Sequence, residues 1–165
     1  MALTKLNSAS VIERLPVGSI IQTKNFQTGV LDTGSALIPF DDTIPQITEG
    51  DEYMTLAFTP TSATNKLHID VRLNINTTAE NALVVALFEG TTANALACFV
   101  NREDAYKNKN VSFSHHMLAS STSELTFRVR AGANASNTTS FNGYGTGGKY
   151  GGSLASSITI MEIKQ

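Results

Sequence analysis

The sequence predicts an all-β protein in which antiparallel strands pack as a closed sandwich. Apolar and polar residues alternate with a period of two, as in strands that bury one face. Turn-forming residues separate these runs at short intervals, and hardly any segment has a helical period. No connection is long enough to hold the crossover helix that joins parallel strands, so the sheets should be antiparallel.

Eight segments have the composition of strands. Segment 67–75 (LHIDVRLNI) shows the alternation most clearly, and segment 124–132 (ELTFRVRAG) repeats it. Segment 82–90 (ALVVALFEG) is apolar without alternation, and the turns on both sides of it favour a buried strand over a short helix. The other expected strands are 19–24, 53–60, 96–102, 111–118 and 156–164.

Residues 1–17 differ from residues 18–165, which we expect to form the sandwich domain. They carry spaced apolar residues ahead of the first strand, so we expect an extended arm or one marginal helix. A free arm of this kind is normally disordered. Its apolar residues make sense if the arm docks on another chain, and the candidate docking residues are Leu3, Leu6, Val11, Ile12 and Leu15.

Charge and hydropathy exclude two classes of partner. The formal net charge is −2, and no run of lysine and arginine provides a surface for nucleic acid. No stretch of about 18 apolar residues could span a membrane, and the N-terminus has no apolar core of a secretory signal. We therefore expect a soluble protein that stays where it is made and binds neither nucleic acid nor membrane.

The cysteine and histidine residues give little indication of a disulfide or a metal site. One cysteine, Cys98, excludes a disulfide within the chain, and its apolar surroundings predict a buried side chain. His115 and His116 are neighbours in a strand, so they point to opposite faces and cannot ligate one metal ion together. With His68, they are more simply polar or pH-sensitive strand residues, although a histidine could meet its copies on a symmetry axis. We expect no metal and no cofactor.

Acidic residues cluster in two loops. The clusters are Asp41 and Asp42, and Glu49, Asp51 and Glu52. Paired acids serve glycoside hydrolysis, and loop oxygens bind calcium, but the spacing matches no calcium loop and the chain has no tryptophan to hold a sugar. No nucleophile motif accompanies them. We interpret them as solvated loop charges and expect no enzymatic activity.

A glycine-rich stretch precedes the last strand. Within FNGYGTGGKYGGS (residues 141–153), Gly143 to Lys149 has the spacing that begins a phosphate-binding P-loop. Tyr150 stands where that motif needs serine or threonine, and a strand rather than a helix follows. The stretch is therefore expected to be a long flexible connection at one end of the sandwich. Tyr144, Lys149 and Tyr150 are candidate contacts with a partner or another subunit.

The order of these features resembles the small jelly-roll proteins and knob domains of tailed bacteriophages. The resemblance lies in GSIIQTKNFQTG, DTGSALIPF, TLAFTPTSATNKLHIDVRLNI and the closing SSITIMEIKQ, and it covers residues 18–165. It implies an antiparallel β-sandwich of jelly-roll type that forms a homotrimer similar to the tumour-necrosis-factor class. It also implies a virion component without catalytic residues, assembled in the bacterial cytoplasm. Arg72, Arg128 and Arg130 lie on polar strand faces that suit a subunit interface as well as water.

Two virion roles remain open. The chain has neither heptads nor an internal repeat that could form a fibre shaft. An arm of 17 residues, fully extended, reaches roughly 55 Å. These features favour a capsid decoration (cement) protein that binds the major capsid protein or a tail adaptor. The alternative is a tail-fibre or receptor-binding knob that recognises a host glycan or protein through loops 90–95 and 141–148.

Overall fold

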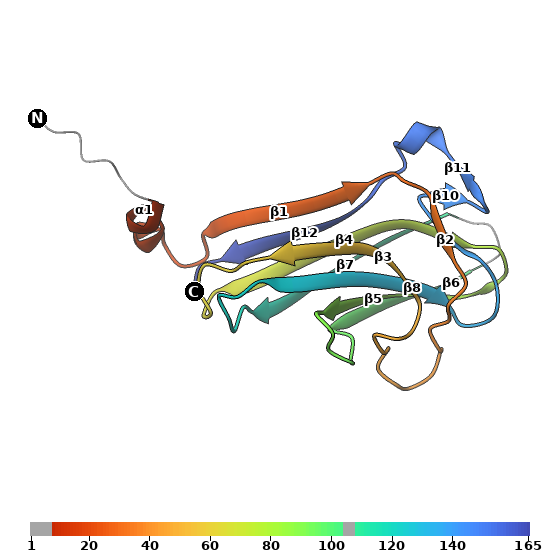
Figure 1. Ribbon diagram of the computed structural model, residues 1–165, viewed down its shortest axis with the longest axis horizontal. Helices are drawn as coiled ribbons and strands as arrows, with labels where there is room; N and C mark the ends of the chain where they lie inside the picture. The colour runs from red at the N-terminus through yellow and green to blue at the C-terminus, as the bar shows by residue number, and fades with distance from the viewer. Residues whose placement is uncertain (1–7, 104–107) are drawn as a thin grey trace, which may run out of the picture.

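The computed structural model describes residues 8–103 and 108–165, which form an elongated β-sandwich with one short helix standing apart at one end (Figure 1). The helix α1 spans Ser8–Arg14 and a 3₁₀ turn spans Tyr150–Gly152. The strands are β1 (Ile20–Thr28), β2 (Asp32–Gly34), β3 (Asp51–Phe58), β4 (Lys66–Thr77), β5 (Asn81–Glu89), β6 (Ala97–Glu103), β7 (Lys109–Leu118), β8 (Leu125–Ala133), β9 (Thr139–Phe141), β10 (Gly143–Tyr144), β11 (Gly147–Gly148) and β12 (Ser156–Ile163).

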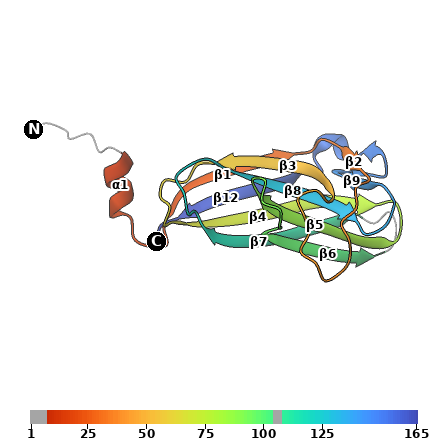
Figure 2. The ribbon, with the colours of Figure 1, turned by 60° about the horizontal axis from the view of Figure 1, so that its bottom comes forward.

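The long strands are connected as in a jelly roll. One sheet has the order β1-β12-β4-β7, with the short strands β9 and β2 continuing beside the end of β4. The facing sheet has the order β3-β8-β5-β6 (Figure 2). Numbered in chain order, the eight long strands therefore run 1-8-3-6 and 2-7-4-5, which is the jelly-roll order with its Greek-key connections. The predicted antiparallel jelly-roll sandwich is confirmed.

The core lies between the two sheets and follows the alternation in the sequence. In β4, every second residue from Leu67 to Ile75 is fully buried, whereas the alternate residues from His68 to Asn74 are partly or largely exposed. Phe127 of β8 and Ile160 of β12 close the core from both sides. Burial of these side chains is the main stabilising term of the fold.

Strand β5 is buried on both faces, which explains its continuous apolar sequence. Leu83, Val85 and Leu87 face the main core. The alternate side chains, Val84, Ala86 and Phe88, form a second cluster with Ile38 from the segment 35–50, which crosses the outside of the sheet. The prediction of a buried strand is confirmed. The strand is buried on its outer face because the segment 35–50 covers it.

The prediction that Cys98 is buried is wrong. Cys98 is exposed on β6, an edge strand whose inward side chain is the neighbouring Phe99. It lies opposite Ala86 on the outer face of its sheet. The apolar run around Cys98 misled the prediction, because an edge strand buries only one of its faces.

Candidate docking arm and contact loop

Helix α1 stands off the end of the sandwich at which the chain also finishes (Figure 1). The helix stops just before Pro16, as expected because a residue that precedes proline avoids the helical conformation. Of the predicted docking residues, Val11 is exposed and Ile12 and Leu15 are half-buried. Leu3 and Leu6 lie outside the described residues.

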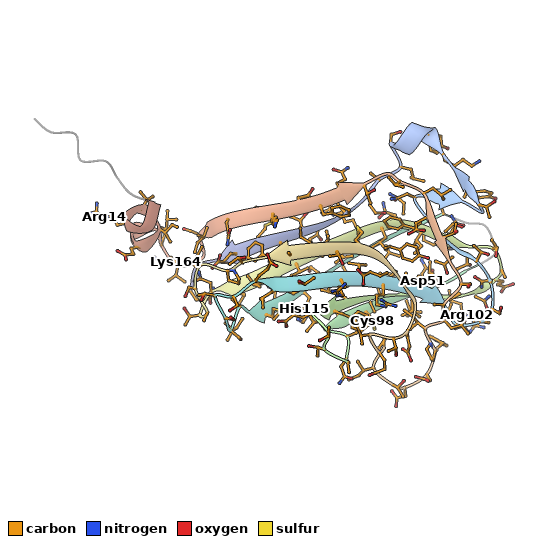
Figure 3. The ribbon with its side chains drawn as sticks, viewed as in Figure 1. Arg14, Asp51, Cys98, Arg102, His115 and Lys164 are labelled. Carbon is orange, nitrogen blue, oxygen red and sulfur yellow. The ribbon has the colours of Figure 1, made fainter. Side chains whose placement is uncertain are left out.

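Lys164 anchors the end of the helix to the sandwich. Its Nζ donates hydrogen bonds to the carbonyl oxygens of Ile12 (3.0 Å), Glu13 (2.8 Å) and Leu15 (2.7 Å). A lysine at this position satisfies carbonyls that a helix end leaves free and complements the negative end of the helix dipole. Figure 3 shows Lys164 at the end of the sandwich nearest to Arg14 of the helix.

Replacing Lys164 by methionine should release the helix without unfolding the sandwich. Hydrogen bonds from a charged group contribute about 1.5–3 kcal/mol, so we expect hydrogen exchange of residues 8–17 to become roughly ten-fold faster or more. Exchange in β4 should not change. Lys24→Met, an exposed change on β1, is the matched control. Unchanged exchange in residues 8–17 of the Lys164 variant would show that the lysine does not hold the helix.

A buried carboxylate braces the same end of the molecule. Glu162 of β12 is fully buried and accepts hydrogen bonds from Thr61 N (2.9 Å), Ser62 N (3.2 Å), Asn65 Nδ2 (2.7 Å) and Gln22 Nε2 (2.7 Å). Burial raises its pKa, but these bonds together outweigh burial and hold the pKa below its usual value. Glu162 thus joins the closing strand to the loop of the TPTSATN segment, and the two quoted motifs meet in space.

A groove of about 400 Å³ separates the arm from this end of the sandwich. Ile12 from the arm, Ile21 from β1 and Lys164 line it, together with the loop that Glu162 holds. Lys164 and the loop held by Glu162 therefore position the base of the arm on the sandwich. Val17 (72% exposed) and Ile20 (55%), in the segment that leads from the helix into β1, are exposed apolar side chains, as is Val11 of the helix.

The glycine-rich stretch lies at the opposite end of the molecule (Figure 1). It contains the β10–β11 hairpin and the 3₁₀ turn, so it has more regular structure than the long connection predicted. Positive φ angles at Gly145 (58°), Gly151 (60°) and Gly152 (86°) explain the need for glycine at these turns. Loop 90–95, which we expected beside it, follows the end of β5 and lies toward the arm end of the strands, as the bond from Gly90 N to Thr126 O shows.

Exposed aromatic side chains project from this loop. Tyr150 is 78% exposed and Tyr144 is 43% exposed. The ammonium group of Lys149 lies 5.9 Å from the centre of the Tyr144 ring, within reach of a cation–π contact. At the base of the loop, buried Asn142 donates to Thr28 O (2.8 Å) and accepts from Ser156 Oγ (2.6 Å). The structure therefore brings Tyr144 and Lys149 together on a fixed base, and the exposed Tyr150 follows Lys149 in the chain.

The arginines expected on polar strand faces do not share one surface. Arg72 lies on β4 and pairs with Asp70. Arg128 and Arg130 lie on β8, in the other sheet, where both form ion pairs with Glu52. Arg130 also donates to the backbone carbonyls of Glu49 (2.8 Å) and Gly50 (2.6 Å), so Arg130 holds the end of the segment that covers β5.

The acidic loops have structural contacts. Asp41 and Asp42 are exposed, as predicted, and hydrogen bonds from Thr43 lower the pKa of Asp41. Asp51, in contrast, accepts a bond from Ala36 N (2.8 Å). Glu49 accepts one from Gln46 N (2.9 Å), so the interpretation as solvated charge is incomplete for the second cluster.

The histidines separate as their strand positions predict. His116 lies opposite His68 on the outer face of the first sheet, and their rings share a hydrogen bond. His115 lies opposite buried Ile69 and is half-buried. Burial lowers its pKa, with a smaller contribution from the charge of His116. Within residues 8–103 and 108–165, no group of three or more His, Cys, Asp or Glu side chains could hold a metal ion.

No helix in the described part of the chain is long and apolar enough to cross a membrane. No protein-family model and no curated protein matches the sequence.

Solved structures that resemble the chain include the CBM36-1 domain of a multidomain xylanase from the hindgut metagenome of Trinervitermes trinervoides. It has 10% identity and a TM-score of 0.43, with coverage of 84% of this chain and 96% of that domain. The Eiger TNF of S. frugiperda has 12% identity and a TM-score of 0.38, with coverage of 87% and 92%. The VP2 subviral particle of infectious bursal disease virus has 11% identity and a TM-score of 0.37, with coverage of 88% and 38%. At these TM-scores the similarities carry no inference about function, and the fold assignment rests on the strand order.

Proposed function

We propose that the protein is a non-enzymatic structural component of a tailed-phage virion, a trimeric capsid decoration protein attached through its N-terminal arm. The observation that carries this proposal is the arm itself. Its helix stands away from the sandwich, is clamped at its base by Lys164, and continues into exposed Val17 and Ile20. The motifs that resemble phage jelly-roll proteins support the virion role and the trimer.

Apolar exposure at the arm favours a protein partner. Fully burying an aliphatic side chain contributes about 1.5–3 kcal/mol, so covering Val11, Val17 and Ile20 would supply several kcal/mol to attachment. A capsid groove that accepts a short amphipathic helix meets this requirement. The arm and the glycine-rich loop lie at opposite ends of the sandwich (Figure 1). Attachment by the arm would therefore leave the loop pointing away from the shell.

Deleting residues 1–17 should abolish attachment and leave the sandwich folded. We expect an unchanged oligomeric state by light scattering and a loss of co-sedimentation with undecorated capsids of at least ten-fold. The matched control is the double variant Tyr144→Ser/Tyr150→Ser, which changes the far end and should still decorate capsids. Full occupancy of capsids by the truncated protein would contradict attachment through the arm.

A receptor-binding knob is the second candidate, and the exposed loop favours it. Tyr144, Lys149 and Tyr150 present rings and a charge on a fixed base, as partner-binding surfaces often do. In this role the serine double variant would lose labelling of host cells, whereas the protein without its arm would keep it. The two variants therefore distinguish the candidates by opposite results.

A further inference from the structure

Three side chains that can bind a metal ion lie in one row across the outer face of the first sheet. Met161 of β12 lies opposite His68 of β4, and His68 lies opposite His116 of β7. Figure 2 shows these three strands side by side. Met161 lies between buried Ile160 and Glu162, so it faces outward like the two histidines. Directly opposite residues on one face have Cβ atoms about 4.5–5.5 Å apart.

The two imidazoles already point toward each other. Nδ1 of His68 lies 2.6 Å from Nε2 of His116, and the rings meet edge to face with centres 4.4 Å apart. One nitrogen must carry the shared proton while the other offers its lone pair. A metal ion between these two nitrogens would have two neutral imidazole ligands once the proton of the donor ring moves to its other nitrogen, so that each ring carries its proton on the side away from the metal.

We propose that His68, His116 and Met161 form a copper site with a preference for Cu(I). Imidazole binds several transition metals, whereas a thioether selects the soft Cu(I) ion. Two nitrogens with bonds of about 2 Å to one metal ion lie about 3–3.5 Å apart. The pair must therefore open by less than about 1 Å, which rotation of the exposed His116 side chain supplies.

Neighbouring groups on this face also favour a soft ion. The nearest carboxylate along β4 is that of Asp70, and it is bound to Arg72 Nε at 2.8 Å. Ser114 stands opposite Asp70 on β7. The row thus offers two nitrogens and one sulfur, and the nearest carboxylate along β4 is already paired with Arg72. The expectation of no metal site rested on His115 and His116, which share a strand. The pairing of β4 with β7 instead places His68, from another strand, opposite His116.

The proposal predicts one Cu(I) ion per chain. The full-length protein without an affinity tag would be titrated anaerobically with Cu(I) against a colorimetric chelator. All measurements use a Cys98→Ser background, because the exposed thiol would itself bind copper. His68→Asn or His116→Asn should weaken Cu(I) binding by at least about ten-fold, since even residues behind the ligands change metal affinity by 10–100-fold.

Two further variants test the ligand set. Met161→Leu keeps the side-chain volume and should weaken Cu(I) binding about ten-fold while leaving Zn²⁺ binding unchanged. His115→Asn is the matched control and should bind Cu(I) like the parent. X-ray absorption of the Cu(I)-loaded Cys98→Ser protein should show two nitrogen ligands and one sulfur ligand, a result independent of whether a variant folds. No binding in the Cys98→Ser protein, binding indifferent to both histidines, or a metal shell without sulfur would overturn the proposal.

Discussion

Replacing Glu162 by glutamine is expected to lower the free energy of unfolding at pH 7 by about 3 kcal/mol. The carboxylate is fully buried and accepts bonds from Thr61, Ser62, Asn65 and Gln22. Glutamine has nearly the same shape but replaces one acceptor oxygen with a donor amide. Because all four partners are donors, the variant would place an amide donor against at least one of them in place of an acceptor. Urea denaturation at pH 7 measures the loss.

The same variant should remove a pH dependence. The folded pKa of Glu162 lies below its usual value, so the carboxylate stabilises the fold fully above the unfolded pKa of about 4.3. That contribution is lost as the pH falls through the folded pKa. Stability of the parent should therefore fall as the pH drops below about 5, and the variant should show a smaller fall. Exposed Glu124→Gln is the control. An equal slope in parent and Glu162→Gln proteins would contradict the role given to Glu162.

Replacing Phe88 by alanine is expected to cost about 3–5 kcal/mol and to loosen the segment that covers β5. Phe88 is fully buried in the second cluster, where it packs with Ile38, Val84 and Ala86. The change leaves a cavity under residues 35–50 rather than in the main core. Limited proteolysis of the folded variant should therefore cut first within 35–50, and urea denaturation should report the loss of stability.

Val100→Ala provides the comparison for Phe88. Val100 lies on the outer face of edge strand β6 and is 45% exposed, so its truncation should cost no more than about 0.5 kcal/mol. Its proteolysis pattern should match that of the parent. If Phe88→Ala leaves residues 35–50 as resistant as in the parent, the second cluster does not hold that segment.

The strands were predictable because their pattern is local. Alternation in 67–75 and 124–132 marked β4 and β8, and continuous apolar residues in 82–90 marked β5. The short strands β2, β10 and β11 were missed because two or three residues carry no period. Cys98 was misplaced because the sequence does not show which strand lies at an edge.

The site residues were predictable only where the local composition of a segment indicates an exposed loop. Glycines and tyrosines marked the loop at 141–153, but nothing indicated that Lys164 would reach the helix carbonyls of residues more than a hundred positions away. Glu162 did carry a signal: it occupies an inward position of SITIMEI, where a carboxylate must find several donors if it is buried. The His68–His116 pair depends on the ladder between β4 and β7, which no local pattern contains.

The location of the chain on the virus particle tests the proposed function most directly. Cryo-electron microscopy of the virion that contains this protein, reconstructed without imposed assumptions about its site, would show where the jelly roll sits and which end faces the particle. The proposal predicts trimers on the capsid shell with helix α1 and Val17 against capsid subunits and the Tyr150 loop pointing outward. Density at the distal end of a tail fibre, with the Tyr150 loop toward the host and the arm buried in a fibre shaft, would contradict it.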